Sequence, residues 1–293
     1  MSTFKPLLAE TLEDTSKIPF PVLASPKLDG IRAIIKDGVV YSRSMKPIRN
    51  KYVQELFGWA DLDGLDGELI VGDPTDKDVY LKTNSGVMSA SGCPDVKFYA
   101  FDRWDLADLP FVERESHLED AALAVGVVRL TQRLINNSEE LLTYEKDALA
   151  LGYEGVMLRR PEGVYKFGRS TAKEFILMKL KRFSDAEYKV VGFEERMKNN
   201  NEATKNELGY TERSTCQENL QGRGDLGALV LEFTDGQTFN CGTGFTDKAR
   251  AEIWNNRDQY IGQLAKVKSF LIGVKDLPRF PVFVSFRDKD DIS

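Results

Sequence analysis

From about residue 187 onward the sequence becomes a succession of short β-type segments, and this feature constrains the fold more than any other. A single helical pattern, from about Thr246 to Tyr260, lies between the third and the fourth of five such segments. The five are EYKVVGF, LGALVLEF, QTFNCG, AKVKSFLIG and FPVFVSFR. Five strands with one helix in this position are typical of an OB-type barrel, which commonly binds nucleic acid. We therefore predict a β-barrel domain over residues 187–293.

Residues 1–186 show a mixed pattern instead. Helical periodicity covers 112–125 and 138–151, and strand-like segments occur at 20–24, 67–71, 97–101, 155–159 and 174–181. Asp37 and Gly38 lie between two β-rich runs, which is a strong signal for a hairpin. The sequence thus predicts an α+β protein, with a mixed α/β domain over 1–186 followed by the barrel.

A polar stretch interrupts the second domain at about 196–225. A loop of this length in a compact domain is usually functional or disordered. Five basic and five acidic side chains lie between Arg196 and Asp225, so the stretch is neutral overall. A simple electrostatic tail is therefore not expected.

Composition excludes several classes of site. His117 is the only histidine, and Cys93, Cys216 and Cys241 are far apart, so histidine-based triads, zinc sites and a disulfide framework are not expected. The N-terminus has no apolar signal segment, and the longest apolar run, 121–128, is too short to span a bilayer. We expect an intracellular protein without a membrane span.

Charge is unevenly distributed along the chain. The net charge of −6 argues against a nucleic-acid partner, but residues 157–182 hold eight basic and two acidic side chains. This basic stretch can follow a polyanion, or it can be an ordinary solvated strand edge.

The segment KLDGIR at 27–32 places Lys27 at the start of a turn after a strand. The chain has no P-loop and no GxGxxG segment, so a nucleotide site must be of another kind. A lysine becomes nucleophilic when neighbouring cations favour its neutral form. Since an Asp-Gly turn is commonplace at protein surfaces, this motif alone is only suggestive.

Further motifs follow in a fixed order: SRSMKPIRN at 42–50, LDGELIVG at 65–72, KFYAFD at 97–102, EGVMLRR at 154–160 and FILMKLKR at 175–182. Lys179 and Lys181 share one face of a strand by the period of two. Taken singly, each motif also has a purely structural interpretation, such as a wet strand face or a core aromatic residue. KPLLAETLE at 5–13, YKFGRST at 165–171, GYTERST at 209–215 and RFPVF at 279–283 extend the series.

Together these motifs resemble the ATP-dependent DNA ligases, a family of the covalent nucleotidyltransferase superfamily. The resemblance implies a nucleotidyltransferase (adenylation) domain, an OB-fold domain and a hairpin at about 196–225 that is mobile without DNA and closes around the duplex. It implies that ATP adenylates a lysine, that AMP passes to the 5′-phosphate of a nick, and that the 3′-OH then seals the strand. The partners implied are ATP, Mg²⁺ or Mn²⁺, and nicked duplex DNA.

The resemblance also assigns roles to single residues. Lys27 would be the nucleophile, and Asp29 would lie near the nick ends. Lys179 and Lys181 would neutralise the α-phosphate. The remaining nucleotide contacts would be Arg32, Glu68 for the ribose, Phe98 as the surface on which adenine stacks, and Glu154; Glu154 and Glu68 would also hold the metal. DNA contacts would be Arg32, Ser42, Arg43 and Arg169. Arg287, assisted by Lys289 and less directly by Arg279, would orient the pyrophosphate.

Several alternatives remain open on the sequence. An mRNA capping guanylyltransferase would share Lys27, the paired lysines and the barrel, and would use GTP. An RNA ligase would share the first domain, whereas a non-catalytic OB-type nucleic-acid binder would leave the lysine motif unexplained. We expect a monomer without an obligate protein partner, in the cytoplasm or nucleoid of its host, and a viral gene is compatible with the resemblance.

Overall fold

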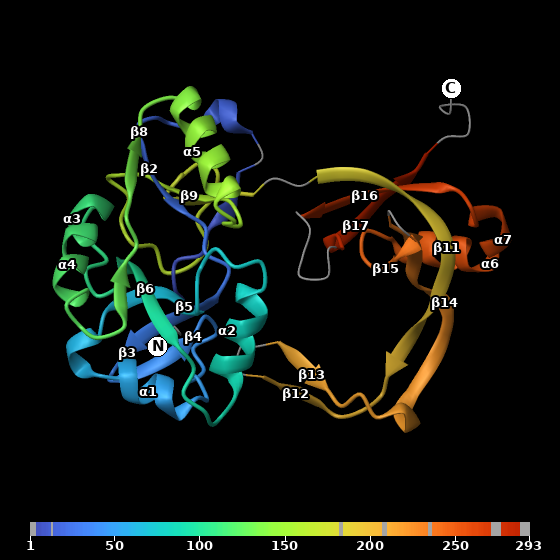
Figure 1. Ribbon diagram of the computed structural model, residues 1–293, viewed down its shortest axis with the longest axis horizontal. Coiled ribbons are helices and arrows are strands. Elements are labelled where there is room, and N and C mark those ends of the chain that lie inside the picture. Colours follow the sequence, from blue (N-terminus) through green and yellow to red (C-terminus); the bar gives the residue numbers. More distant parts are fainter. Residues whose placement is uncertain are drawn as a thin grey trace. The chain divides into compact units, whose positions relative to one another are not determined.

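The computed structural model describes residues 4–12, 14–181, 184–206, 210–233, 236–270 and 277–287. The chain divides into two compact units (Figure 1). The first consists of 1–181 with 205–210, and the second of 182–204 with 211–293. The boundary expected after residue 186 falls inside strand β11 (Ser184–Asn199) of the second unit.

The first unit contains two five-stranded sheets. One has the order β4-β3-β5-β6-β7, and the other has the order β1-β10-β9-β2-β8. The strands of the first sheet are β3 (Ile31–Lys36), β4 (Val39–Ser42), β5 (Leu65–Val71), β6 (Val96–Arg103) and β7 (Val127–Arg129). Those of the second are β1 (Glu10–Thr11), β2 (Val22–Pro26), β8 (Arg133–Ile135), β9 (Val156–Arg159) and β10 (Leu177–Leu180). This mixed α/β architecture confirms the predicted fold class.

The hairpin predicted at Asp37-Gly38 connects β3 and β4. Both residues have positive φ, 52° and 68°, as a two-residue turn between right-twisted strands requires. Gly67 on β5 shows a second constraint, because a Cβ there would lie 2.4 Å from the ring of Phe98 on β6. The glycine thus allows the ring of Phe98 to pack against β5 and beside Phe57.

Five α-helices surround these sheets. They are α1 (Lys51–Phe57), α2 (Val79–Met88), α3 (Phe111–Ser116), α4 (Leu118–Ala121) and α5 (Ser138–Ala150). The helix expected over 112–125 is interrupted at His117 and ends at Ala121, where the chain turns toward the edge strand β7. Helix α5 matches its expected range, but Asn137 rather than Ser138 caps it by accepting from the backbone NH of Glu140.

The second unit is built on one five-stranded sheet of order β15-β14-β11-β16-β17. Its remaining strands are β14 (Leu220–Glu232), β15 (Thr238–Cys241), β16 (Leu264–Phe270) and β17 (Arg279–Phe286). The predicted helix forms as α6 (Asp247–Asn255), capped by Thr246, and after a break at Asn256 as α7 (Arg257–Tyr260). The five strands with helices between the third and fourth confirm the OB-type arrangement.

Strands β11 and β14 continue beyond the barrel as a two-stranded ribbon (Figure 1), paired as far as Asn199 and Leu220. The polar insertion then adds the short pair β12 (Ala203–Lys205) and β13 (Thr211–Arg213). The Asn201 side chain donates to the carbonyls of Ser214 and Cys216, and its oxygen accepts from Asn219. The predicted insertion is therefore a hydrogen-bonded hairpin in this structure.

Candidate active site

Lys27 directly follows β2 and is fixed through its backbone to the segment before β9. Its NH donates to the carbonyl of Gly155 at 2.8 Å, and its carbonyl accepts from the NH of Glu154 at 3.2 Å. Gly155 has φ 155°, and a Cβ there would lie 2.4 Å from the carbonyl oxygen of Leu180. The EG pair at 154–155 thus allows three strands to converge on Lys27.

Glu154 joins two lysines. Its Oε2 accepts from Lys27 and its Oε1 accepts from Lys181, which follows β10. Burial alone would raise the pKa of Glu154, but the two ammonium groups hold it below its ordinary value. Burial lowers the pKa of Lys181 despite its contact with Glu154. The structure thus brings together three of the residues that the sequence singled out.

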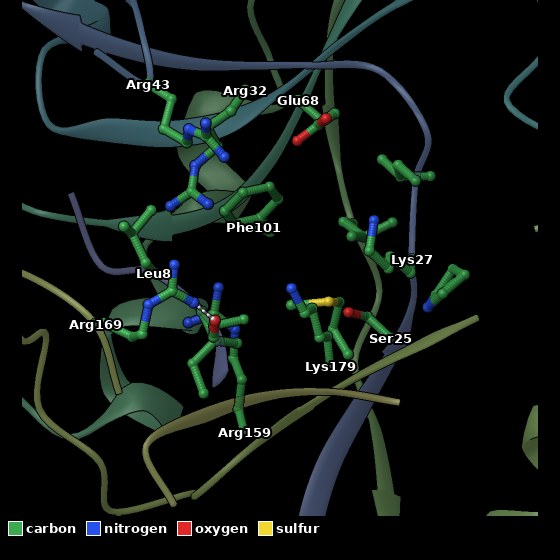
Figure 2. Close-up of a pocket in the computed structure, with 16 residues that line it drawn as sticks. Leu8, Ser25, Lys27, Arg32, Arg43, Glu68, Phe101, Arg159, Arg169 and Lys179 are labelled. Atoms are coloured by element: carbon green, nitrogen blue, oxygen red, sulfur yellow. Dashed lines mark hydrogen bonds between the residues drawn. The ribbon is translucent and has the colours of Figure 1, made fainter. Parts of the chain in front are cut away.

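A cavity of about 220 Å³ opens beside Lys27 (Figure 2). Among the described residues that line it, six are basic and Glu68 is the one acidic residue. The basic residues are Lys27, Arg32, Arg43, Arg159, Arg169 and Lys179. The rest of the wall is mainly apolar and includes Leu8, Leu28, Phe101, Leu130 and Met157. A cationic pocket with an apolar wall suits a ligand that carries both phosphates and a flat base.

Phe101 is the aromatic residue of this wall (Figure 2). The guanidinium of Arg32 lies 4.7 Å from its ring centroid and that of Arg159 lies 5.5 Å away. Phe98, expected from the sequence to stack on adenine, is completely buried in the core and points to the opposite side of β6. That expectation is therefore corrected, because residues 98 and 101 differ by an odd number of positions along a strand.

Glu68 lies on β5 and lines the cavity. Burial raises the pKa of Glu68 to about 7, against the effect of Lys27 and Arg32, and Glu154 and Asp29 raise it further. Asp29 is half-buried in the turn after Lys27, where its charge also acts on Lys181. Lys179, on the cavity wall, has a pKa lowered by burial and by the charges of Lys27 and Arg169. Electrostatic coupling therefore extends through the whole cluster.

Two buried aspartates accept hydrogen bonds from arginines of the cavity wall. The completely buried carboxylate of Asp66 accepts from Arg32 at 2.5 Å and from the hydroxyl of Tyr165 at 2.6 Å. Asp102 accepts from Arg114 at 2.7 Å and from Arg159 at 2.6 Å. Neither Arg159 nor Asp102 was singled out from the sequence. The sequence does contain a signal for them, because each is a charged residue directly after a hydrophobic run: FYAF precedes Asp102, and VML precedes Arg159.

Of the residues expected from the sequence to contact DNA, some line the cavity and one is buried in the core. Arg43, after β4, and Arg169 both line the cavity, and Arg169 also donates to the carbonyl of Ala9 at 2.7 Å. Ser42 is completely buried, and its hydroxyl lies 3.1 Å from that of Ser44. The expectation for Ser42 is corrected, because it ends a strand whose even-numbered residues face the core.

Arg287 lies in the second unit, directly after β17. Its backbone NH donates to the carbonyl of Leu264, and its side chain donates to Glu187 at 2.5 Å. Arg279 begins β17, and Lys289 lies outside the described residues. Arg287, which the sequence leads us to expect as a pyrophosphate contact, therefore belongs to the barrel of the second unit.

Comparison with known proteins identifies the family. Residues 6–181 match the family model described as "ATP dependent DNA ligase domain", and residues 220–287 match that described as "DNA ligase OB-like domain". The chain belongs to the family of ATP-dependent DNA ligases. Its fold is that of a nucleotidyltransferase domain followed by an OB-like domain, as the sequence motifs indicated.

Individual relatives include cellular and viral ligases. The DNA ligase of Vaccinia virus (strain Ankara) is 26% identical over 197 residues, which cover 58% of this chain and 35% of the viral protein. A probable DNA ligase of Streptomyces avermitilis is 30% identical over 169 residues, which are 50% of this chain and 33% of that protein. The chain thus spans about a third of the length of the curated relatives that it matches.

Solved structures give longer matches. The crystal structure of Chlorella virus DNA ligase-adenylate is 35% identical, with 98% of this chain and 100% of that chain covered and a TM-score of 0.55. A Lig E DNA ligase described as a minimal scaffold for DNA binding is 24% identical, with the same coverage and a TM-score of 0.73. At this identity the match supports the fold only. In the described part of the chain, no helix combines the length and apolarity needed to cross a membrane.

Proposed function

We propose that this protein is an ATP-dependent DNA ligase that seals nicks between a 3′-OH and a 5′-phosphate in duplex DNA. One observation carries the proposal: Lys27 stands at the edge of a cavity that gathers six basic side chains and the exposed part of Phe101. The basic side chains suit a triphosphate, and the ring of Phe101 suits a stacked purine. The family membership and the likeness to a ligase-adenylate structure support the same reaction.

The reaction starts with the free amine of Lys27. Its nitrogen attacks the α-phosphorus of ATP, the α–β phosphoanhydride bond breaks, and pyrophosphate leaves with both bonding electrons. Lys179 and Lys181 supply positive charge where the α-phosphate becomes more negative. Glu154 orients both Lys27 and Lys181, since it accepts from each of them. The product is a lysyl-AMP phosphoramidate.

Two further steps transfer the phosphate. An oxygen of the nick 5′-phosphate attacks AMP and releases Lys27, after which the 3′-OH attacks the 5′-phosphate and expels AMP. We propose that Arg43 and Arg169, both on the cavity wall, bind the 5′-phosphate, because a guanidinium engages phosphate bidentately. Arg32 lines the same cavity, and we propose that Asp29 and Arg32 lie near the ends of the nick. On the barrel, Arg287 is proposed to orient the pyrophosphate.

A divalent cation fits the site in a limited sense. The described residues contain no cluster of three or more metal-binding side chains. Mg²⁺ commonly needs only one or two carboxylates together with substrate phosphates, and Glu154 and Glu68 can supply them. Bound there, Mg²⁺ or Mn²⁺ would neutralise the charge of the phosphates. We propose that the protein works inside the cell as a monomer, which its three free cysteines permit.

The proposal is tested by covalent labelling. Incubation with [α-³²P]ATP or [α-³²P]GTP, followed by denaturation, should label the protein with AMP only, through an acid-labile bond. GMP labelling would favour a capping guanylyltransferase, and no label would favour a non-catalytic binder. Sealing of an all-DNA nick beside an RNA-containing nick separates DNA ligation from RNA ligation.

The nucleophile is tested by substitution. Lys27→Ala should lose AMP labelling by at least about a thousandfold, yet it should seal a nick that already carries AMP, because that step does not need the lysine bond. Lys27→Arg should fail in the same way, since a guanidinium stays protonated. Retained labelling of Lys27→Ala would contradict the assignment.

A further inference from the structure

Arg287 and Glu187 form an ion pair on the barrel that the proposed reaction does not use. Arg287 Nη1 lies 2.5 Å from Glu187 Oε2, although the two residues are 100 positions apart in the sequence. The backbone holds both ends, because Glu187 is paired within β11 and Arg287 donates to Leu264 directly after β17. The pair thus follows from the sheet order β11-β16-β17.

Three neighbouring strands place their side chains on the same face at this point. Lys266 on β16 is directly opposite Glu187, and Ser285 on β17 is directly opposite Lys266. Arg287 follows Ser285 by two positions and therefore shares its face. Glu187 thus has a cation beside it on β16 and a second cation, Arg287, reaching back over the edge strand.

We propose that Glu187 is a positioning residue that holds Arg287 on the barrel until a nucleotide is bound. The carboxylate of Glu187 and the phosphates of the nucleotide then compete for the guanidinium of Arg287. This inference rests on the proposed role of Arg287 toward pyrophosphate. While Arg287 Nη1 donates to Glu187, that arm of the guanidinium cannot also donate to a phosphate. When Arg287 leaves, Lys266 remains opposite Glu187, so the carboxylate keeps a neighbouring positive charge.

The strength of the pair suits a reversible contact. The side chains of Arg287 and Glu187 are 39% and 34% exposed, so water and salt screen their attraction. An ion pair that is exposed to this degree changes the equilibrium between its paired and unpaired states by about two- to fivefold. A triphosphate carries several negative charges and accepts both arms of a guanidinium, and it therefore wins the competition.

The experiment measures self-adenylation of the full chain at ATP concentrations far below KM. Glu187→Gln removes the charge but keeps the shape, and it should raise kcat/KM for adenylation about two- to fivefold. Sealing of a pre-adenylated nick should not change, because pyrophosphate has already left. Glu232→Gln is the matched control: Glu232 is a partly exposed glutamate of the same sheet, 3.9 Å from Lys189, and its variant should adenylate like the parent.

A double-mutant cycle assigns the effect to Arg287. In the Arg287→Ala background, Glu187→Gln should give no increase. Slow adenylation of Arg287→Ala together with an unchanged or reduced rate for Glu187→Gln overturns the holding contact and leaves the proposed function intact. Adenylation of Arg287→Ala at the parent rate overturns the proposed role of Arg287 and the inference with it. An increase that persists without Arg287 also contradicts the inference.

Discussion

Phe101 is the aromatic surface that the Lys27 cavity offers to a purine, whereas Phe98 belongs to the core on the other side of β6. Stacking of a base on an aromatic side chain contributes about 1–3 kcal/mol. Phe101→Ala should therefore raise KM for ATP at least about fivefold in the adenylation assay. Phe98→Leu is the matched control, and it should lower the thermal unfolding midpoint while leaving KM near the parent value. Equal KM effects of the two substitutions would contradict this division.

Glu68 links the site to stability. Its pKa is raised from 4.5 to about 7 in the folded protein by burial, so folding disfavours its carboxylate form. This penalty is absent below the unfolded pKa, develops between about pH 4.5 and 7, and is complete above 7. Glu68→Gln should thus stabilise the metal-free protein at pH 8 by about 1–3 kcal/mol but not at pH 4.5. Denaturant unfolding with a chelator present measures it, and an equal gain at both pH values would refute the shift.

Site residues that are marked by a local motif were predictable from the sequence, and site residues that are selected by packing were not. Lys27, Glu154 and Lys181 were singled out by motif, and the structure brings them together. The choice between Phe98 and Phe101 required the face of the strand, and KFYAF presents an aromatic residue on both faces. The arginine network around Asp102 joins residues 57 positions apart, which no local pattern records.

At the scale of elements, two arginines each lie directly after the end of a strand, one in the first unit and one in the second. Arg43 follows β4 at the cavity, and Arg287 follows β17 on the barrel. Arg287→Ala should slow self-adenylation at least about tenfold and spare sealing of pre-adenylated nicks. Arg43→Ala should do the reverse, because the 5′-phosphate enters only after pyrophosphate leaves. Single-turnover assays of both steps decide the matter, and loss of the same step in both variants would contradict it.

The sequence missed helices α1 and α2 as well as three short strands, and the strands share a physical cause. Strands β1, β7 and β8 have two or three residues each, too few to show a period, and they exist because longer strands pair with them. The predicted helix over 112–125 is cut short: α3 and α4 bury Phe111, Arg114 and Leu118, and the next turn, 119–122, buries no side chain. The Asp37-Gly38 hairpin was predictable because its turn is specified by those two residues alone.

At the scale of the whole molecule, the proposed function requires a chain with net charge −6 to bind DNA. The basic side chains of the Lys27 cavity supply part of the neutralisation, and the family resemblance implies that the hairpin supplies more by closing around the duplex. The hairpin over 196–225 is neutral overall, so its contribution to DNA binding depends on where its cations lie rather than on an excess of them. Within 198–221 these are Lys198, Lys205 and Arg213.

Replacing residues 198–221 by a short Gly-Ser linker tests the hairpin. Self-adenylation should stay near the parent rate, because the Lys27 cavity is lined by residues of the first unit from outside this segment. Nick affinity should fall at least about tenfold, and sealing should fall with it. Each lost phosphate contact lowers the slope of log K against log salt by about 0.9, so the loss of three cations should flatten the slope by up to about three.

A charge-only variant separates contact from shape. Lys198→Gln with Lys205→Gln keeps the hairpin and its Asn201 hydrogen bonds but removes two cations, and it should flatten the slope by up to about two. If the hairpin also encloses the duplex, the linker variant should release nicked DNA much faster than this charge variant at equal salt. Dissociation rates from fluorescent nicked duplex measure the difference. A linker variant that binds and seals like the parent would show that the segment is dispensable, because neither its charges nor its shape would then hold the DNA.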